Sequence, residues 1–461
     1  MMLIFPILYT LSFVFSLIAL SKKEPSGILI YIIFGLPIYT TSLTICFISG
    51  YKNIIPFLQS FKEIIVILTL IIVLYNFKRK IKLLLLDKLI IGFIIFSLLY
   101  LLLPLGSYSF NEKILAEKSL VFFYLLYFTG RFFDLKKIYL TKYFYYIFLV
   151  SLLSTSVLLF EIINNTHLQT KTGYALFNEY YYGSKPEGSY GLSWTFERTN
   201  GLKRFASFFS NPLEYAASTL IVLPLMFGLY TTHKNKIRIN KLGLMVLAAT
   251  IITIIFSVSR ASFISYLIII YTYAIITKKK LLLHIIHAAL LLFAFYLIVQ
   301  INNKGIAQFI IDSINLKDSS TVAHITEWID GINALITHPM GMGLGESGRV
   351  ANAMGANIGG ENQFIIIGVQ IGIVGLFMNL LIYAVAISTP YSWIFKLQGR
   401  ERKLCIAVLL MKISFFIPLM TSYFESYTYI SYISWFFTGL LINMIDRKIQ
   451  TKKSIMHAAK N

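Results

Sequence analysis

The chain has 461 residues, of which 57% are apolar and only 13% are charged, and its formal net charge is +21. The charged share is about half of that in an ordinary soluble domain, and a single soluble core cannot bury so much apolar surface. The composition therefore excludes a soluble globular protein. The net charge does not by itself indicate nucleic-acid binding, because the basic residues lie in short clusters between apolar segments.

Apolar segments recur along the chain at lengths of about 17–25 residues, which allow a helix to cross the ~30 Å hydrocarbon layer of a membrane. The first segment has no basic stretch before it and no small-residue cleavage site, so we expect an uncleaved span rather than a signal peptide. The sequence predicts an all-α polytopic membrane protein with about 12–13 transmembrane helices. The predicted spans are 2–20, 27–49, 63–77, 86–105, 115–133, 143–163, 213–231, 242–259, 261–277, 281–300, 363–388, 404–421 and 426–445.

Basic residues gather in every second connection between these spans. Connections rich in Lys and Arg stay in the cytoplasm, so we expect a cytoplasmic C-terminus and, with thirteen spans, an external N-terminus. A different division of the first two spans would change the count. The basic clusters are Lys78–Lys80 with Lys82; Lys136, Lys137 and Lys142; Lys234, Lys236, Arg238 and Lys241; Lys278–Lys280; Lys396, Arg400, Arg402 and Lys403; and the tail from Arg447.

Two connections are long, and the charge pattern places both on the outer side of the membrane. Long loops in compact proteins are usually functional or disordered, and neither loop has a disordered composition. They divide the chain into N-terminal transmembrane helices (1–163), a first external loop (164–212), central transmembrane helices (213–300), a second external loop with an amphipathic helix (301–362), and C-terminal transmembrane helices with a cytoplasmic tail (363–461).

The first external loop is rich in aromatic residues, which include Tyr181 and Trp194. Tyrosine and tryptophan favour the headgroup region of a membrane, and their faces also stack on sugar rings. The sequence leaves both interpretations open, an interfacial belt and a glycan-binding loop.

The second external loop contains a predicted helix over 319–336, where apolar residues recur at spacings of three and four. The tripeptide Thr337-His338-Pro339 ends this helix. Gly341, Gly343 and Gly345 follow and predict a turn-rich stretch.

Four cationic residues lie at the outer boundary. Arg260 stands at the tip of a hairpin between two spans, where its side chain either extends to the lipid headgroups or faces an outward cavity. Arg198, Lys203 and Arg204 precede the span that begins near residue 213. Because the planar guanidinium suits bidentate phosphate contacts, this cluster fits a lipid pyrophosphate. A solvated basic loop is the alternative.

Glu361 directly precedes the long apolar segment that begins at residue 363. A carboxylate at this place is a helix cap or, if it faces a cavity, a general base, and both interpretations stay open. The sequence has no Asp-x-Asp motif, no dinucleotide-binding glycine motif and no Walker sequence. Its two cysteines, Cys46 and Cys405, lie in separate predicted spans. We therefore expect no metal, no nucleotide and no structural disulfide.

Three stretches resemble the O-antigen polymerase/ligase superfamily, which comprises Wzy-type polymerases and O-antigen ligases, and they occur in that family's order. Residues 204–212 resemble its arginine-led segment entering a span, and residues 259–262 resemble its Ser-Arg hairpin tip. Residues 338–345 and 361–375 are similar to its Pro-x-x-Gly-x-Gly turn, the His or Glu that opens the next span, and the glycine pattern that follows. The resemblance covers about residues 198–380.

Two positions depart from the family's pattern. His324, which precedes Trp328 in the external helix, occupies a position where the family often has arginine. Glu361 stands where ligase-like members have histidine, and this glutamate favours a polymerase over a ligase.

The resemblance implies a GT-C-like glycosyltransferase of the bacterial inner (plasma) membrane that acts on its periplasmic side, without metal or cofactor. It would polymerise repeat units of O-antigen, capsule or a related surface polysaccharide, with inversion. The implied partners are undecaprenyl-pyrophosphate-linked oligosaccharide, membrane lipids, a chain-length regulator and a flippase, and no nucleic acid. The implied catalytic residues are Glu361 as base with Arg204 and Arg260 on the pyrophosphate. The predicted substrate-binding residues are Arg198, Lys203, His324, His338, Asn362, Tyr181 and Trp194.

Two alternative functions remain at this point. An O-antigen ligase would transfer the glycan to the lipid A core. A transporter or flippase for lipid-linked oligosaccharide would also be polytopic and basic, although transporters usually show internal repeats and broken helices near the midplane.

Overall fold

The computed structural model describes residues 3–79, 82–198, 201–232, 235–299, 319–355 and 357–458. Within these ranges the chain is built of helices, and its β contacts are three isolated bridges. The prediction of an all-α polytopic membrane protein is confirmed. The helices are α1 Ile4–Ser21, α2 Ile28–Ile30, α3 Tyr39–Ile48, α4 Ile55–Tyr75, α5 Leu85–Leu102, α6 Phe110–Val121, α7 Tyr124–Arg131, α8 Leu140–Ile163, α9 Leu168–Thr172, α10 Tyr174–Tyr182, α11 Pro212–Tyr230, α12 Lys241–Phe256, α13 Arg260–Ile276, α14 Lys280–Val299, α16 Ser319–Thr337, α17 Arg349–Ala353, α18 Gln363–Trp393, α19 Gly399–Ser414, α20 Phe416–Thr421 and α21 Thr428–Ala458.

Nine segments of the described residues are long and apolar enough to cross a membrane. They are Ile4–Ser21, Pro25–Ile48, Lys52–Tyr75, Leu85–Leu102, Leu140–Ile163, Pro212–Tyr230, Gln363–Trp393, Gly399–Thr421 and Thr428–Thr451. Three shorter apolar helices, Lys241–Phe256, Arg260–Ile276 and Lys280–Leu292, coincide with further predicted spans. The predicted span 115–133 is divided between α6 and α7. The third span begins at Lys52 rather than at residue 63, so Lys62 also lies within it.

The interior of the bundle is formed around α11 and α21. The most apolar stretches of these two helices are 89% and 94% buried. Glycines allow close helix contacts there, as in many membrane bundles. A Cβ on Gly439 of α21 would lie 1.9 Å from Tyr127 O, and one on Gly130 of α7 would lie 2.2 Å from Phe436 O. α21 therefore packs against α7 backbone to backbone.

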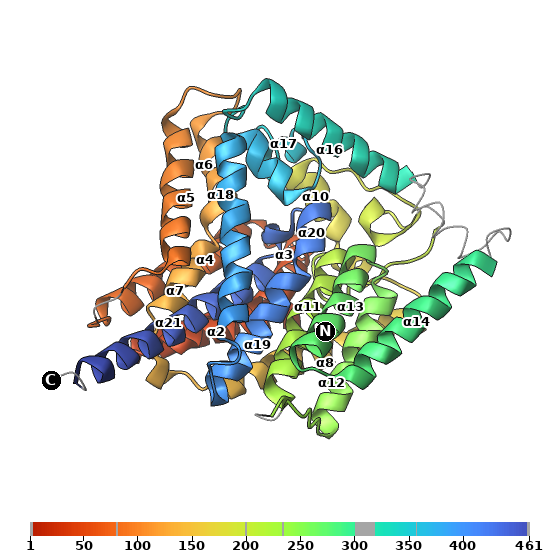
Figure 1. The fold of residues 1–461 in the computed structure, drawn as a ribbon. Coiled ribbons are helices and arrows are strands. Elements are labelled where there is room, and N and C mark those ends of the chain that lie inside the picture. Colours follow the sequence, from red (N-terminus) through yellow and green to blue (C-terminus); the bar gives the residue numbers. More distant parts are fainter. Residues whose placement is uncertain are drawn as a thin grey trace.

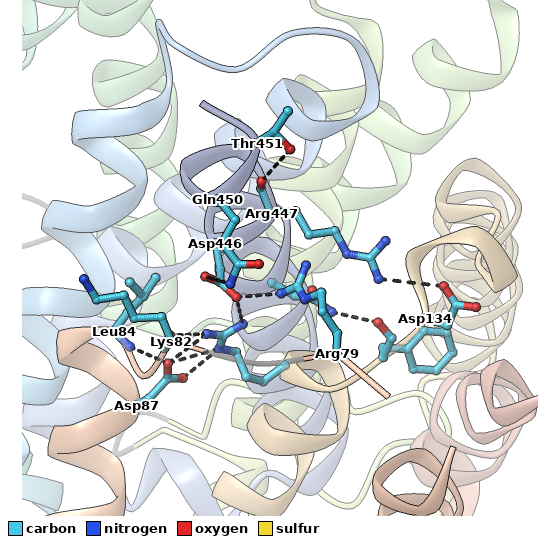
Figure 2. A network of polar contacts seen from close by, with 12 residues as sticks. Arg79, Lys82, Leu84, Asp87, Asp134, Asp446, Arg447, Gln450 and Thr451 are labelled. Carbon is cyan, nitrogen blue, oxygen red and sulfur yellow. Dashed lines mark hydrogen bonds and ion pairs between the residues drawn. The ribbon is translucent and has the colours of Figure 1, made fainter. Parts of the chain in front are cut away.

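A network of buried charges joins α5, α7 and α21 (Figure 2). Arg131 is fully buried and donates from Nε to Asp87 Oδ1 (2.9 Å), while its Nη1 pairs with Asp446 Oδ2 (3.3 Å). Arg79 Nη2 also pairs with Asp446 Oδ2 (2.5 Å), and Tyr127 Oη donates to Asp87. Such pairs are costly to break because a buried charge is left uncompensated.

We expect Asp87→Ala to lower the free energy of unfolding by about 3–5 kcal/mol, because Arg131 loses its principal partner. Asp134→Ala is the matched control, since Asp134 pairs with Arg447 at 3.7 Å on the surface and should contribute no more than about 1 kcal/mol. Thermal unfolding of the purified protein in detergent measures both. Equal losses in the two variants would contradict a stabilising role of the buried network.

α18 is bent in the middle. Gly372 has φ +74° and ψ −179°, outside helical geometry. The bend frees carbonyl groups of the preceding turn, and residues 339–345, here called the glycine loop, supply their partners. Two amides of the glycine loop donate to Val369 O (2.7 Å) and Gln370 O (3.1 Å).

The contact between the glycine loop and α18 is reciprocal. Pro339 O accepts a hydrogen bond from Ile373 N–H (2.9 Å). A Cβ on Gly341 would lie 2.6 Å from Gly372 N, and a Cβ on Gly372 would lie 2.6 Å from Pro339 O. Neither glycine therefore tolerates a side chain. The predicted turn is thus a clasp that holds the end of α16 against the middle of α18.

One end of the bundle is covered by segments of the two loops that are predicted to be external, and α16 lies across this end (Figure 1). α16 packs on α18, and α17 packs on α6. α21 starts at this end, directly after Tyr427, and Asp446 lies about 27 Å further along it at 1.5 Å per residue. The external segments and the buried charge network are therefore separated by roughly the thickness of a bilayer core.

Candidate active site

Four of the predicted site residues line one cavity of about 420 Å³, which we call the arginine cavity. It lies between the external segments and the ends of α11, α13 and α20. Its lining residues are Arg204, Leu213, Ala217, Ser259, Arg260, Ala261, Ser262, His324, Ile325, Trp328, Glu361, Pro418, Thr421, Ser422, Phe424 and Tyr427.

The two arginines are positioned by a shared piece of backbone. Arg260 is the first residue of α13, whose N-cap Ser259 accepts a hydrogen bond from Ser262 N–H (3.4 Å). Phe205 N–H donates to Phe256 O at the end of α12 (3.1 Å). The residue after Arg204 is therefore tied to the helix end that precedes Arg260, and this link brings both guanidinium groups to the same cavity.

Glu361 does not cap α18. The N-cap is Asn362, whose Oδ1 accepts from Phe364 N–H (3.0 Å) and Ile365 N–H (3.2 Å). The capping interpretation of Glu361 is therefore wrong, because the next residue already performs that role. Glu361 remains solvent-accessible at the cavity wall.

The backbone before Glu361 requires glycine. Gly359 and Gly360 have φ values of +86° and +64°. A Cβ on Gly360 would lie 2.2 Å from Glu327 Oε2, so this turn packs closely on α16. α16 and Glu361 are thereby held together.

The surroundings of Glu361 raise its pKa. Desolvation by the neighbouring protein is the main cause, the carboxylate of Glu327 adds to it, and His324 opposes it. His324 Nδ1 lies 3.6 Å from Glu327 Oε2. A carboxylate with a raised pKa has a higher proton affinity and is a better general base.

α16 also presents a hydrogen-bond donor to the arginine cavity. Trp328 lines the cavity, and its buried Nε1 has no hydrogen-bond partner among the described residues. Indole N–H is a donor only, so this group suits an oxygen atom of a bound molecule.

Glu361 also lines a second cavity of about 420 Å³, which we call the tyrosine cavity. Leu213, Glu361 and Tyr427 belong to both cavities. The carboxylate thus stands at the boundary between a cavity with two arginines and a cavity with several tyrosines. The other lining residues of the tyrosine cavity are Leu36, Tyr39, Thr40, Leu43, Lys62, Tyr174, Phe177, Asn178, Tyr182, Ser184, Thr195, Ser210, Asn211, Glu214, Gly348, Arg349, Asn352, Ala353, Asn357, Gly360, Ile366, Tyr423, Ser426 and Thr428.

Several predicted binding residues lie elsewhere. Lys203 Nζ donates to Asn165 O (2.5 Å) and stands over the Tyr190 ring, where it holds the first external loop together. Arg198 N–H donates to Leu202 O (3.1 Å) in the same loop. Neither Lys203 nor Arg198 is among the lining residues of either cavity.

The remaining four predicted residues are also separate from the arginine cavity. Asn362 is the N-cap of α18 and lines neither cavity. His338 lies next to Thr337 Oγ1 (3.0 Å) and lines another cavity below the end of α16. Tyr181 packs on Phe177, and Trp194 is 63% exposed in the first external loop.

Lys62, Glu214 and Arg349 line the tyrosine cavity but are not among the site residues predicted from the sequence. Glu214 has a local signal, since it is the third residue of α11, which begins at Pro212 after the N-cap Asn211. Lys62 interrupts an apolar segment, which is itself unusual. Arg349 carries no comparable signal. Among the described residues, no group of three or more His, Cys, Asp or Glu side chains has the arrangement of a metal site.

The fold and these cavities define a multi-pass membrane protein with a carboxylate- and arginine-lined site at one end of its helices. Residues 244–380 match a protein-family model described as O-antigen ligase, and this segment contains Arg260, α16 and Glu361. The match confirms the resemblance to the O-antigen ligase and polymerase superfamily and indicates a function of that type. A comparison with curated proteins gave no match.

Proposed function

We propose that the protein polymerises lipid-linked oligosaccharide repeat units of O-antigen, capsule or a related polysaccharide. The observation that carries this proposal is the position of Glu361 at the boundary between the arginine cavity and the tyrosine cavity. A base placed between two cavities can take a proton from an acceptor in one while the donor lies in the other.

The proposed reaction is an inverting displacement. Glu361 accepts the proton of an acceptor hydroxyl, and the hydroxyl oxygen forms a bond to the anomeric carbon of the donor glycan. The bond between that carbon and the pyrophosphate oxygen breaks, and undecaprenyl pyrophosphate leaves as an anion. Arg204 and Arg260 line the arginine cavity and would stabilise the charge that develops on the leaving group.

The site would face the outside of a bacterial inner membrane. Support comes from the basic clusters at alternate connections and from the bilayer-sized distance between the external segments and the buried charge network. The donor would then reach the arginine cavity from the outer leaflet.

An O-antigen ligase is the second candidate, and the description of the matching family model favours it. Such an enzyme would use the same base and arginines but would transfer the glycan to a lipid A core. The two candidates differ in the acceptor alone.

We expect the purified protein to convert lipid-linked repeat units, taken from cells that lack this gene, into a ladder of longer lipid-linked glycans. No metal or nucleotide sugar should be needed, so the ladder should form in EDTA, because Glu361 and the arginines supply the base and the countercharge. Gel electrophoresis of the lipid-linked products measures this. Products that form only after addition of lipid A core would show that the protein is a ligase and not a polymerase. Dependence on a nucleotide sugar would refute both candidates.

A further inference from the structure

We propose that the tyrosine cavity is the subsite for the acceptor sugar and that Tyr182 and Glu214 help to determine which sugar is accepted. The inference rests on the proposed function, since an acceptor exists only if the protein transfers a glycan. It assigns the arginine cavity to the donor and the tyrosine cavity to the acceptor, with Glu361 between them.

The lining of the tyrosine cavity is that of a carbohydrate site. Five tyrosines from three parts of the chain line it, namely Tyr39, Tyr174 and Tyr182 of α10, and Tyr423 and Tyr427. Aromatic faces pack against the apolar C–H faces of sugar rings. Planar amide and carboxylate groups on the same walls suit pairs of sugar hydroxyls.

The charges of the two cavities differ in a way that separates their ligands. The tyrosine cavity contains Lys62 and Arg349 against Glu214 and Glu361, so its formal charges balance. The arginine cavity contains two arginines against Glu361 alone. A pyrophosphate therefore favours the arginine cavity, and an uncharged polyhydroxyl group suits the tyrosine cavity.

Two of the tyrosine rings are held in place by cations. Lys62 Nζ lies 4.6 Å from the centre of the Tyr39 ring and 3.4 Å from its hydroxyl oxygen. The Arg349 guanidinium lies 5.7 Å from the centre of the Tyr182 ring. These contacts fix ring orientation, and fixed rings bind with a smaller loss of entropy.

Glu214 is positioned by the start of α11. Its amide donates to Asn211 Oδ1 (2.9 Å), and its carboxylate accepts a hydrogen bond from the Ser210 hydroxyl. The side chain is only 7% exposed, yet it lines the tyrosine cavity. A carboxylate accepts more than one hydrogen bond, so Glu214 can bind a sugar hydroxyl while it keeps Ser210.

The rest of the acceptor also has a place. A cavity of about 760 Å³ shares Tyr39, Lys62, Tyr182 and Arg349 with the tyrosine cavity and continues between α4 and α6. There its lining is mixed, with apolar, polar and charged side chains: Pro56, Gln59, Ser60, Glu63, Glu112, Leu115, Lys118, Ser119, Phe122 and Phe123. An acceptor whose terminal sugar reaches Glu361 would therefore extend through this cavity toward α4 and α6.

The test uses a soluble acceptor, the repeat-unit oligosaccharide released from its lipid by mild acid. With lipid-linked repeat as donor, we measure the concentration of this oligosaccharide that gives half-maximal extension. Tyr182→Ala and Glu214→Gln should each raise it about tenfold, the effect of one lost stacking or charged hydrogen-bond contact. Tyr180→Ala is the matched control, because Tyr180 lies on the same helix, is 61% exposed and is not in the cavity lining. Inhibition by undecaprenyl pyrophosphate should be unchanged in both variants.

Unchanged half-saturation in both variants, with normal extension by the wild-type protein, would overturn the acceptor assignment and leave the proposed function in place. Weaker inhibition by undecaprenyl pyrophosphate in the same variants would also overturn it, since the tyrosine cavity would then hold the donor. If the wild-type protein extends no glycan at all, the proposed function fails and the assignment fails with it.

Discussion

Glu361→Gln should express normally and form almost no polymer, with a rate about 10²–10⁴-fold below that of the wild-type protein. Glutamine keeps the size and polarity of the side chain but cannot accept the proton of the acceptor hydroxyl. Because Asn362 caps α18, the substitution removes no helix cap and stability should not change. The measurement is the initial rate of ladder formation, together with thermal unfolding in detergent.

The pH dependence gives an independent check of this role. The rate should rise with pH as Glu361 loses its proton, and the rise should lie above the ordinary carboxyl range because the pKa of Glu361 is raised. Glu327→Gln removes a neighbouring negative charge, so the pKa of Glu361 should fall and the acid limb should move to lower pH. Normal polymer length in Glu361→Gln would exclude it as the base, and His324 and His338 would then be tested.

Arg260→Ala should lower the rate by about 10²–10³-fold, which is typical for loss of one group that stabilises a developing oxyanion. Arg260→Lys should restore little of this loss, since an ammonium lacks the planar fork that binds two phosphate oxygens. Arg204→Ala and Arg204→Lys should behave in the same way, because both arginines line the arginine cavity.

The matched control for the arginine variants is Lys171→Ala. Lys171 lies on α9 of the first external loop, and its Nζ stands 5.5 Å from the centre of the Phe160 ring, so it belongs to neither cavity. It should keep nearly full activity. Full activity of Arg260→Ala, with the protein present in the membrane, would show that the guanidinium only extends to the lipid headgroups and takes no part in the reaction.

The sequence was sufficient for most of the spans, because most apolar segments are long and the composition admits no soluble alternative. It failed at 115–133, where the chain forms the two shorter helices α6 and α7. It also indicated Arg204, Arg260 and Glu361, because each stands near the predicted outer end of a span. A charged residue at such a place is costly to insert, which favours a functional role. Their gathering around one cavity agrees with that expectation. Each of these residues has a local signal that can be recognised without knowledge of the fold.

Other parts of the site depend on contacts between distant segments and could not be predicted. Tyr39, Lys62 and Arg349 meet in the tyrosine cavity from three separate parts of the chain. Lys203 carries the same charge as the site arginines, but its contact with Asn165 directs it into the loop. The bend at Gly372 could not be predicted from the spacing of apolar residues, because it depends on hydrogen bonds from the glycine loop.

The clasp between the glycine loop and α18 has a consequence for the exchange of segments between related enzymes. The loop supplies hydrogen bonds that α18 lacks at its bend, so neither partner is complete alone. An external segment taken from another enzyme would bring a loop shaped for a different bend. A chimaera that moves residues 319–375 as one block keeps the clasp intact, whereas a junction placed between the loop and the bend should separate two halves of one structural unit. The smallest segment that can be exchanged between such proteins without breaking the clasp therefore includes the first half of α18, and not the loop alone.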